Sequence, residues 1–320
     1  MGIVINLMST DKHEIYVGKK MVGPMVRGST LPFRVSCLDF GADVVFSPGL
    51  VDLAIIESKR VEMNGRSLLV KSENNREKNI FDTIPEEKGR LIVQLITNDG
   101  PNATKALEIL GDMPSAIDIN CGCPEEFAVH RGCGSAMTIE RINDVVKTIK
   151  RVSELPVSVK FRIKDTVPES IQFAKAIEMS GADALILHGR NVTKKHKGEI
   201  DYDHMRTVFE SVGIHKISNG GISSLEGATE MISKTGCSSI MICGAALKNP
   251  SVFSMSPLTG PQALAHLCEV GKRLNTPYNE GKWSVQQIIY GCKAFYPDHE
   301  PVIRKAETWE DVSKAILNLI

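Results

Sequence analysis

Short apolar runs alternate with amphipathic stretches through most of this 320-residue chain. The apolar runs predict strands, and the spacing of apolar residues between them predicts helices. We expect strands at 19–25, 43–48, 90–96, 116–120, 156–163, 182–190, 215–221 and 238–246, and helices at 30–40, 51–60, 103–110, 139–152, 170–180, 203–211 and 225–234. Alternating helices and continuously apolar strands indicate parallel pairing. About eight such units fit an α/β fold of the (β/α)8 TIM-barrel type better than an open sheet.

Two parts of the chain depart from this alternation. Residues 61–89 are polar and irregular, with SLLVKSE (67–73) as a candidate hairpin arm. After Met255, proline and glycine mark a linker, and the remaining sequence has helical spacing. We therefore predict a barrel domain over 1–255 and a small all-helical domain over 256–320.

Composition narrows the function classes only a little. Lys+Arg and Asp+Glu both total 38, so the net charge is zero and a nucleic-acid partner would need a local basic patch. The eight cysteines include no CxxC pair, so we expect no disulfide framework, no metal and a reducing compartment. No apolar run approaches the roughly 20 residues of a membrane span, and the N-terminus lacks signal-peptide features. We expect a cytoplasmic or nuclear protein with no membrane partner.

The most informative stretch runs from Ala116 to Met137, where a buried strand ends in Asn-Cys-Gly-Cys-Pro. Glycine and proline predict a loop there, with a thiol just past the end of an interior strand. In a barrel of this kind, the carboxyl ends of the strands line the active site. The candidate residues at such ends are Pro24, Met25, Gln94, Asn120, Cys123, Lys160, Arg162, His188, Arg190, Asn219, Gly220, Gly221, Gly244 and Ala245.

Glycines follow the seventh and eighth predicted strands, which is the usual phosphate position of this fold. Gly220, Gly221 and Gly244 would let backbone N–H groups approach phosphate oxygens. An ordinary glycine turn is the alternative at each strand end taken alone. The pair at two adjacent strands favours phosphate binding.

Polar residues at the other strand ends suit a flat heterocycle. Lys160 and His188 lie at the ends of adjacent strands, and a lysine there is costly to bury unless it meets an anion or an electron-rich ring. Gln94 and Asn120 offer amide donors and acceptors for the edge of a heterocycle. The alternatives are a solvated lysine and histidine, and amides that cap local turns.

Two cysteines at this loop, Cys121 and Cys123, are candidates for the catalytic thiol. Cys123 precedes proline in a glycine-rich loop, which is unusual for a core cysteine, and would serve as a nucleophile or a proton donor. Cys121 faces the same way on an extended chain, so spacing alone does not separate the two. Nearby, the basic segment 188–199 together with Arg131 would form an electrostatic footprint for a phosphate-rich substrate, with a solvated face as the alternative.

Eight motifs are spread over the whole predicted barrel. They are MVGPMVRGSTLPFR (21–34), FGADVVFSPGLVDL (40–53), VQL (93–95), DINCGCP (118–124), VKFRI (159–163), LHGR (187–190), SNGG (218–221) and CGAALKNPSVF (243–253). In this combination the chain resembles the tRNA-dihydrouridine synthase family, and most of all the eukaryotic class that modifies uridine 20. The helical tail is similar to the family's tRNA-binding domain.

The resemblance implies an NAD(P)H-dependent enzyme that reduces uridine to 5,6-dihydrouridine in the D-loop of tRNA, with NADPH reducing a bound flavin mononucleotide (FMN). Reduced flavin would pass hydride to C6 of the uracil, and Cys123, which matches the family's catalytic cysteine, would protonate C5. Uracil's polarised 5,6 double bond and a thiol protonated at neutral pH agree with this chemistry. The tRNA would contact Arg131, Arg162 and Arg190. FMN would be held by Pro24, Met25, Gln94, Asn120, Lys160, His188, Asn219, Gly220, Gly221, Gly244 and Ala245.

Departures from the family pattern include Gly244 and the pair His130-Arg131, where the family often has Lys-Gly. Gly244 stands where the family usually has arginine, so one expected phosphate contact is missing. Two other functions are the alternatives: a catalytically weakened tRNA-binding or folding factor, and a flavin barrel that acts on a free pyrimidine. We expect a monomer with tRNA as its partner.

Overall fold

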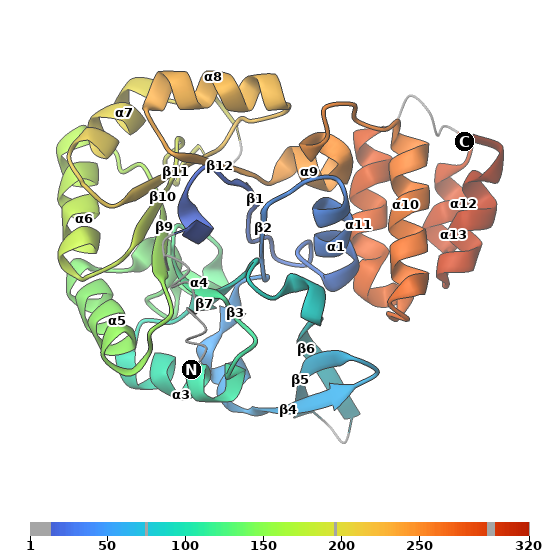
Figure 1. Ribbon diagram of the computed structural model, residues 1–320, viewed down its shortest axis with the longest axis horizontal. Coiled ribbons are helices and arrows are strands. Elements are labelled where there is room, and N and C mark those ends of the chain that lie inside the picture. The colour runs from blue at the N-terminus through green and yellow to red at the C-terminus, as the bar shows by residue number, and fades with distance from the viewer. Residues whose placement is uncertain (1–13, 74–75, 195–196, 293–297, 320) are drawn as a thin grey trace, which may run out of the picture.

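Eight parallel strands close into a barrel. They are β1 (Lys20–Val22), β2 (Val44–Phe46), β7 (Leu91–Ile96), β8 (Ala116–Cys121), β9 (Val157–Arg162), β10 (Ala184–His188), β11 (His215–Asn219) and β12 (Ser239–Ile242). Each strand pairs with its neighbour, and the pairings β12–β1 and β2–β7 close the ring (Figure 1). A short ninth strand, β3 (Leu50–Val51), extends the sheet beside β7. The predicted (β/α)8 architecture is confirmed in this computed structural model, which describes residues 14–73, 76–194, 197–292 and 298–319.

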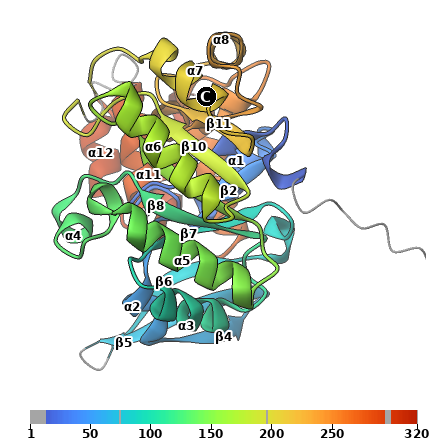
Figure 2. The same cartoon turned by 90° about the vertical axis from the view of Figure 1, so that its left-hand side faces the viewer.

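Helices cover the outside of the barrel, as Figure 2 shows for the side that carries α5 and α6. They are α1 (Leu31–Asp39), α3 (Gly100–Leu110), α5 (Ile139–Val152), α6 (Val167–Met179), α7 (Tyr202–Glu210) and α8 (Leu225–Thr235). In α5, Ile142, Val145, Val146 and Ile149 are buried, which is the spacing of one apolar helix face. These helices agree with the predicted ones to within a few residues at each end.

Side-chain alternation along the strands decides what points into the barrel. In β8, Ile119 and Cys121 belong to the apolar layer between strands and helices, so Asp118 and Asn120 point inward. The amino-terminal part of the barrel interior is apolar, and Tyr16 packs into it. Polar inward-facing side chains therefore gather toward the carboxyl ends of the strands.

The region before β7 differs from the prediction. The helix expected over 51–60 ends early, because α2 spans Asp52–Ile56 and is followed by an antiparallel sheet of β4 (Ser58–Met63), β5 (Arg66–Glu73) and β6 (Arg76–Thr83). Asn64 and Gly65 have φ of 53° and 75°, as a two-residue hairpin turn requires. The hairpin arm predicted at 67–73 is confirmed within β5, whereas the rest of 61–89 is more regular than expected.

The eighth barrel strand is shorter than predicted. β12 ends at Ile242, and the chain turns into the helix α9 (Gly244–Lys248) inside the segment 238–246 that was expected to be extended. The backbone N–H of Leu247 donates to the oxygen of Cys243 at 3.0 Å, which closes the first helical turn. Gly244 therefore opens a helix rather than ending a strand.

Within the described residues, four α-helices follow a 3-10 turn, η4 (Pro250–Phe253). They are α10 (Gly260–Arg273), α11 (Tyr278–Gly291), α12 (Glu300–Lys305) and α13 (Trp309–Ile316), and they share an apolar core that includes Leu267, Val285 and Trp309. Gly271 and Gly281 lie so close to the Trp309 ring that neither has room for a Cβ atom. Helix α10 packs on α1 and α11 packs on α9 (Figure 1). None of the helices within the described residues is long and apolar enough to cross a membrane.

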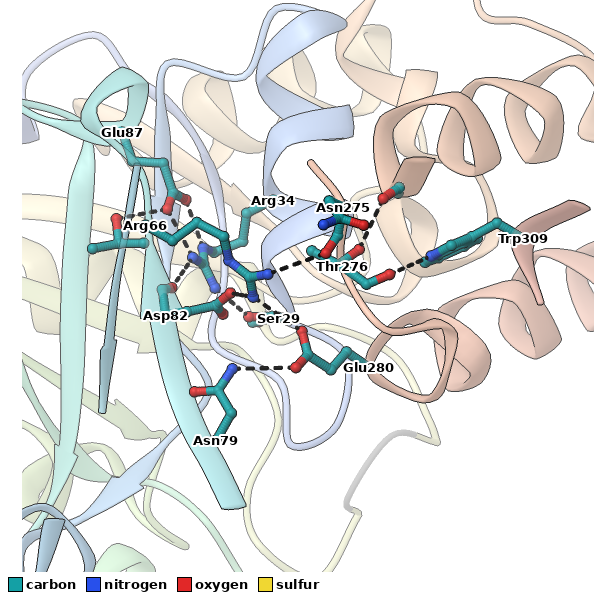
Figure 3. Close-up of polar contacts among 12 residues, drawn as sticks. Ser29, Arg34, Arg66, Asn79, Asp82, Glu87, Asn275, Thr276, Glu280 and Trp309 are labelled. Atoms are coloured by element: carbon teal, nitrogen blue, oxygen red, sulfur yellow. Dashed lines mark hydrogen bonds and ion pairs between the residues drawn. The ribbon is translucent and has the colours of Figure 1, made fainter. Parts of the chain in front are cut away.

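A buried group of charged residues joins these helices to the barrel; we call it the interface network (Figure 3). Arg34 of α1 makes two bonds to Glu87, Nε to Oε1 at 2.6 Å and Nη2 to Oε2 at 2.7 Å. Arg66 of β5 pairs with Asp82 of β6 and also reaches Glu280 of α11 at 3.4 Å. The network therefore ties α1, the antiparallel sheet and α11 into one arrangement.

Candidate active site

The loop after β8 is anchored by Asn120. Its Oδ1 accepts hydrogen bonds from the backbone N–H groups of Gly122 at 3.2 Å and Cys123 at 3.0 Å. Its Nδ2 donates to Oε1 of Gln94 on β7 at 2.8 Å. Asn120 thus caps its own loop, as one of the sequence alternatives proposed, and at the same time connects that loop to the neighbouring strand.

Two further contacts hold the Cys123 backbone. The Cys123 carbonyl accepts from Ser135 N–H at 2.8 Å, and Arg162 Nε donates to the Gly122 carbonyl at 3.1 Å. Gly134 has φ of 60° and lies directly against the Cys123 carbonyl, where a Cβ atom would collide. The loop can therefore close around Cys123 only with glycine at this position.

The structure separates the two thiols. Cys121 is the last residue of β8 and is 1% exposed in the apolar layer between strands and helices. The strand ends at Cys121, and Cys123, in the loop that follows, is half-buried at the carboxyl end of the barrel. Burial raises the pKa of the Cys123 thiol, which keeps it protonated at neutral pH. Such a thiol suits proton donation better than nucleophilic attack as a thiolate.

Lys160, Arg162 and His188 lie side by side on β9 and β10, where His188 is in register with Arg162. His188 Nδ1 accepts from the Arg190 backbone N–H at 3.1 Å and lies 3.3 Å from Arg162 Nη1. A nitrogen that faces two donors is an acceptor, which assigns the ring proton of a neutral His188 to Nε2. Burial lowers the pKa of Lys160. Within the described part of the chain, no side chain or carbonyl forms a hydrogen bond or ion pair with the Lys160 ammonium, so an anion or a polarised ring would complete it.

The backbone at the end of β11 is closely packed, whereas the backbone after β12 has open space beside it. Gly220 and Gly221 have φ of 108° and 73°, and a Cβ on either would come within 2.9 Å of the Ile200 side chain. Asn219 turns inward, where Nδ2 donates to the Met241 carbonyl at 3.0 Å. This hydrogen bond connects the end of β11 to β12. Around Gly244, by contrast, a Cβ would meet nothing within 4 Å.

The chain forms a tight turn after β1, at the same end of the barrel as Cys123. Met25 N–H donates to Ser29 Oγ at 2.9 Å, and Ser29 Oγ donates to the Gly23 carbonyl at 3.2 Å. Pro24 and Met25 are half-buried there. Gly23 lies against the side chains of Met241 and Cys243, which leaves no room for a Cβ atom. Cys243 is thus a second thiol of the site that the sequence analysis did not single out.

The three arginines proposed for substrate binding have different surroundings. Arg162 is 8% exposed and is engaged with the catalytic loop and His188. Arg131 is exposed and pairs with the buried Asp52 at 3.2 Å. Arg190 donates through Nε to the Gly198 carbonyl at 2.8 Å, which folds the basic segment 188–199 back on itself. Residues 195 and 196 of that segment lie outside the described residues.

Asp118 is the main site residue that the sequence analysis missed. It is fully buried and accepts from Gln94 Nε2 and from Ser158 Oγ, both at 2.7 Å. Desolvation raises its pKa to about 7. The available signal was its place two residues before Asn120, which gives both side chains the same inward direction on the strand. Among the described residues there is no group of three or more histidine, cysteine or acidic side chains that could hold a metal.

The family model for dihydrouridine synthases matches residues 21–274. The chain is 27% identical over 315 residues to a tRNA-dihydrouridine(20) synthase [NAD(P)+] of Schizosaccharomyces pombe, an alignment that covers 94% of this chain and 65% of the relative. It is 28% identical to the enzyme of the same name from Saccharomyces cerevisiae, covering 88% and 79% of the two chains. It is also 28% identical to a human tRNA-dihydrouridine(20a/20b) synthase [NAD(P)+]-like protein, covering 81% and 78%.

The family model covers every barrel strand from the second residue of β1 onward, and it covers the loop that presents Cys123. The chain spans just under two thirds of the length of the fission-yeast relative and about four fifths of the other two. The matched segment also extends through α10 into the first part of the helical tail. The chain therefore belongs to the dihydrouridine synthase family.

Proposed function

We propose that this chain reduces a uridine in the D-loop of tRNA, most consistently position 20, to 5,6-dihydrouridine. The observation that carries the proposal is the geometry of Cys123. Its thiol lies at the carboxyl end of a barrel strand, its backbone is fixed by Asn120 and Ser135, and burial keeps it protonated. A positioned, protonated thiol is what the second half of a uracil reduction requires. The relatives' printed names support the same substrate.

FMN is the cofactor that these residues fit. Among the described residues the Lys160 ammonium forms no hydrogen bond or ion pair, and it lies close enough to the Cys123 thiol for the two groups to interact electrostatically. An electron-rich ring or the ribityl chain of the cofactor would give this ammonium group an interaction partner. A Cβ atom at Gly244 would meet nothing within 4 Å, so a phosphate group has room to approach the backbone at the end of β12. Pro24, Met25, Gln94, Asn120 and His188 would surround the ring, and Ala245 with Gly244 would lie next to the phosphate.

When bound and reduced by NADPH, the flavin supplies hydride to C6 of the uracil. The protein's own part is the proton: Cys123 donates from Sγ to C5, and the resulting thiolate regains a proton from solvent. Arg162 holds the Gly122 carbonyl and so keeps the loop from withdrawing the thiol. The target base must leave the tRNA stack to reach Cys123. Arg131 and Arg190, in the loops that follow β8 and β10, would contact the phosphates around the target base.

Absorbance spectroscopy tests the proposal directly. Purified protein loaded with FMN should show flavin bands that bleach with NADPH and return faster when unmodified tRNA is added. A flavin that is reduced but reoxidises at the same rate with and without tRNA would contradict the proposed substrate. Reoxidation by free uridine or orotate as fast as by tRNA would favour a barrel that acts on a free pyrimidine.

One observation favours a second function, a tRNA-binding or folding factor with weakened chemistry. The family's usual arginine is replaced by Gly244, and the space around Gly244 is open. Protein that binds tRNA but takes up no FMN would support this alternative. Flavin uptake restored by Gly244→Arg would then show that the missing arginine is the cause.

A further inference from the structure

Three side chains link the interior of the barrel to Cys123 through directed hydrogen bonds. We call this chain, Asp118–Gln94–Asn120, the amide relay. Gln94 Nε2 donates to Asp118 Oδ2 at 2.7 Å, and Asn120 Nδ2 donates to Gln94 Oε1 at 2.8 Å. Asn120 Oδ1 then accepts from the Cys123 backbone N–H at 3.0 Å. The relay follows the strand pairing, because Gln94 and Asp118 are directly opposite in the β7–β8 register.

The direction of the relay depends on its first member. An amide side chain has an oxygen that accepts and a nitrogen that donates, and a 180° flip exchanges them. The backbone N–H of Cys123 needs an oxygen from Asn120, so Asn120 must present nitrogen to Gln94. Gln94 must therefore present oxygen to Asn120 and nitrogen inward. Only a buried acceptor at the inner end makes that arrangement favourable, and Asp118 supplies it.

Asp118 remains an acceptor toward Gln94 in both of its charge states. Its other oxygen, Oδ1, faces the hydroxyl of Ser158 at 2.7 Å, and a hydroxyl can donate or accept. A proton on Asp118 can therefore lie on Oδ1 and point at Ser158. The other titratable groups that interact electrostatically with Asp118 are Lys160 of β9, Tyr16 and Cys121. None of them is a member of the relay.

We propose that Asp118 is a positioning residue of the reaction: by accepting from Gln94, it fixes both amides of the relay and so sets the position of the Cys123 backbone and thiol. Its effect on turnover rests on the proposed function. Its effect on the loop does not, because the hydrogen bonds are present in the protein without FMN. The two can therefore be tested separately.

The decisive variant is Asp118→Leu, which is similar in size and removes the acceptor. Without the carboxylate, the Gln94 side-chain nitrogen has lost its acceptor, so the Gln94 amide is free to flip. A flipped Gln94 presents its nitrogen to Asn120, and Asn120 must then turn its own nitrogen toward the Cys123 backbone N–H. We expect iodoacetamide to alkylate Cys123 about tenfold faster in flavin-free protein, as the loop loosens by the loss of a buried hydrogen bond. Fragment mass spectrometry separates Cys123 from Cys121. Asp118→Asn, which can keep one oxygen toward Gln94, should be intermediate.

Ser218→Ala is the matched control, since it removes a buried hydrogen bond of the same barrel, Ser218 Oγ to Thr235 Oγ1 at 2.9 Å, outside the relay. It should label like the wild type. Gln94→Met breaks the relay one link nearer the loop and should also accelerate labelling, so the test survives if Asp118→Leu does not fold. Wild-type labelling rates in both folded variants would overturn the proposal.

Turnover gives the second readout. With FMN, NADPH and tRNA, Asp118→Leu should lower kcat about tenfold and leave the KM for tRNA unchanged, because the tRNA surface is untouched. If the wild type forms no dihydrouridine, the proposed function fails and the labelling series alone decides the role of Asp118. If the wild type is active and Asp118→Leu raises KM with kcat unchanged, the positioning role is wrong.

Discussion

Two buried polar groups in this molecule are built on different principles. The interface network sets two arginines against three carboxylates, with direct contacts between opposite charges. The amide relay has one carboxyl group, Asp118, that is served by neutral donors. Burial raises the pKa of Asp118 to about 7, whereas in the interface network Glu87 raises the pKa of Arg34 against the opposing effect of burial.

The difference teaches what each arrangement is suited to do. Paired charges hold parts of the chain together strongly, because removing one partner leaves the other buried and uncompensated. A chain of amides adds less stability but transmits orientation, since each link has a donor end and an acceptor end. The interface network therefore fixes where the helical tail lies, and the amide relay fixes how Cys123 is presented.

Cys123→Ala should produce the largest effect on activity. Loss of a positioned proton donor lowers turnover by roughly 10²- to 10⁴-fold, and the variant should fold normally. The measurement is dihydrouridine formed in tRNA over time. Cys292→Ala, which replaces a thiol in the helical tail, serves as the control with wild-type turnover. Equal turnover in both variants would remove Cys123 from the chemistry.

Glu87→Gln should produce the largest effect on stability. Arg34 would stay buried without its charged partner, at a cost of about 3–5 kcal/mol in the free energy of unfolding. Urea denaturation measures this. Glu77→Gln is the control, because Glu77 and Lys59 pair at 2.6 Å with more than 60% of each side chain exposed, and such a pair contributes less than about 1 kcal/mol. A similar small loss at Glu87 would show that the buried Arg34–Glu87 pair stabilises the protein no more than an exposed pair does.

Asp118 should make the free energy of unfolding depend on pH, with an effect of intermediate size. Its folded pKa of about 7 lies above the usual 3.8, so at intermediate pH the folded protein holds a proton that the unfolded chain has released. Stability relative to Asp118→Asn should therefore fall as pH rises from about 5 to 7, by about 1.4 kcal/mol per pH unit. Denaturation curves of the flavin-free proteins check this. If the free energy of unfolding of the two proteins changed with pH in the same way over that range, Asp118 would not be buried as described.

Asp39→Asn should have the smallest effect. Asp39 joins α1 to α10 through His266 at 3.1 Å and Arg273 at 3.2 Å, but a third of its side chain is exposed. Exposed ion pairs contribute about 0–1 kcal/mol, so thermal unfolding should barely change. A loss as large as that of Glu87→Gln would mean that charge pairing, rather than burial, decides the strength of the interface.

The barrel was predictable because its signals are local. Several barrel strands are short apolar runs, such as β7 (LIVQLI) and β10 (ALILH), and α5 shows the buried face of a helix in its own spacing. The site followed from strand ends, where the fold brings distant residues together. The structure does bring Gln94, Asn120, Cys123, Lys160 and His188 to one end of the barrel.

The misplaced elements depended on competing local signals. The apolar residues of 51–56 led to a predicted helix that continues past Ile56, where the structure has a strand. The turn residues Asn64-Gly65 were the local signal for the hairpin that follows. The alanines of 238–246 fit a strand as well as the helix that Gly244 opens. Only hydrogen bonding between neighbours in space distinguished these cases.

The amide relay and the interface network were out of reach for a different reason. Nothing in the sequence near Asp118 says that Gln94, 24 residues away, donates to it. Arg34 and Glu87 are separated by 53 residues and are brought together only by the packing of α1 against the chain before β7.

The most direct test of the central claim is mass spectrometry of unmodified tRNA after incubation with the FMN-loaded protein and NADPH. The account predicts a gain of two hydrogens at one D-loop uridine, formed by the wild type and abolished in Cys123→Ala. A folded, flavin-loaded protein that binds tRNA and leaves every uridine unreduced would contradict it.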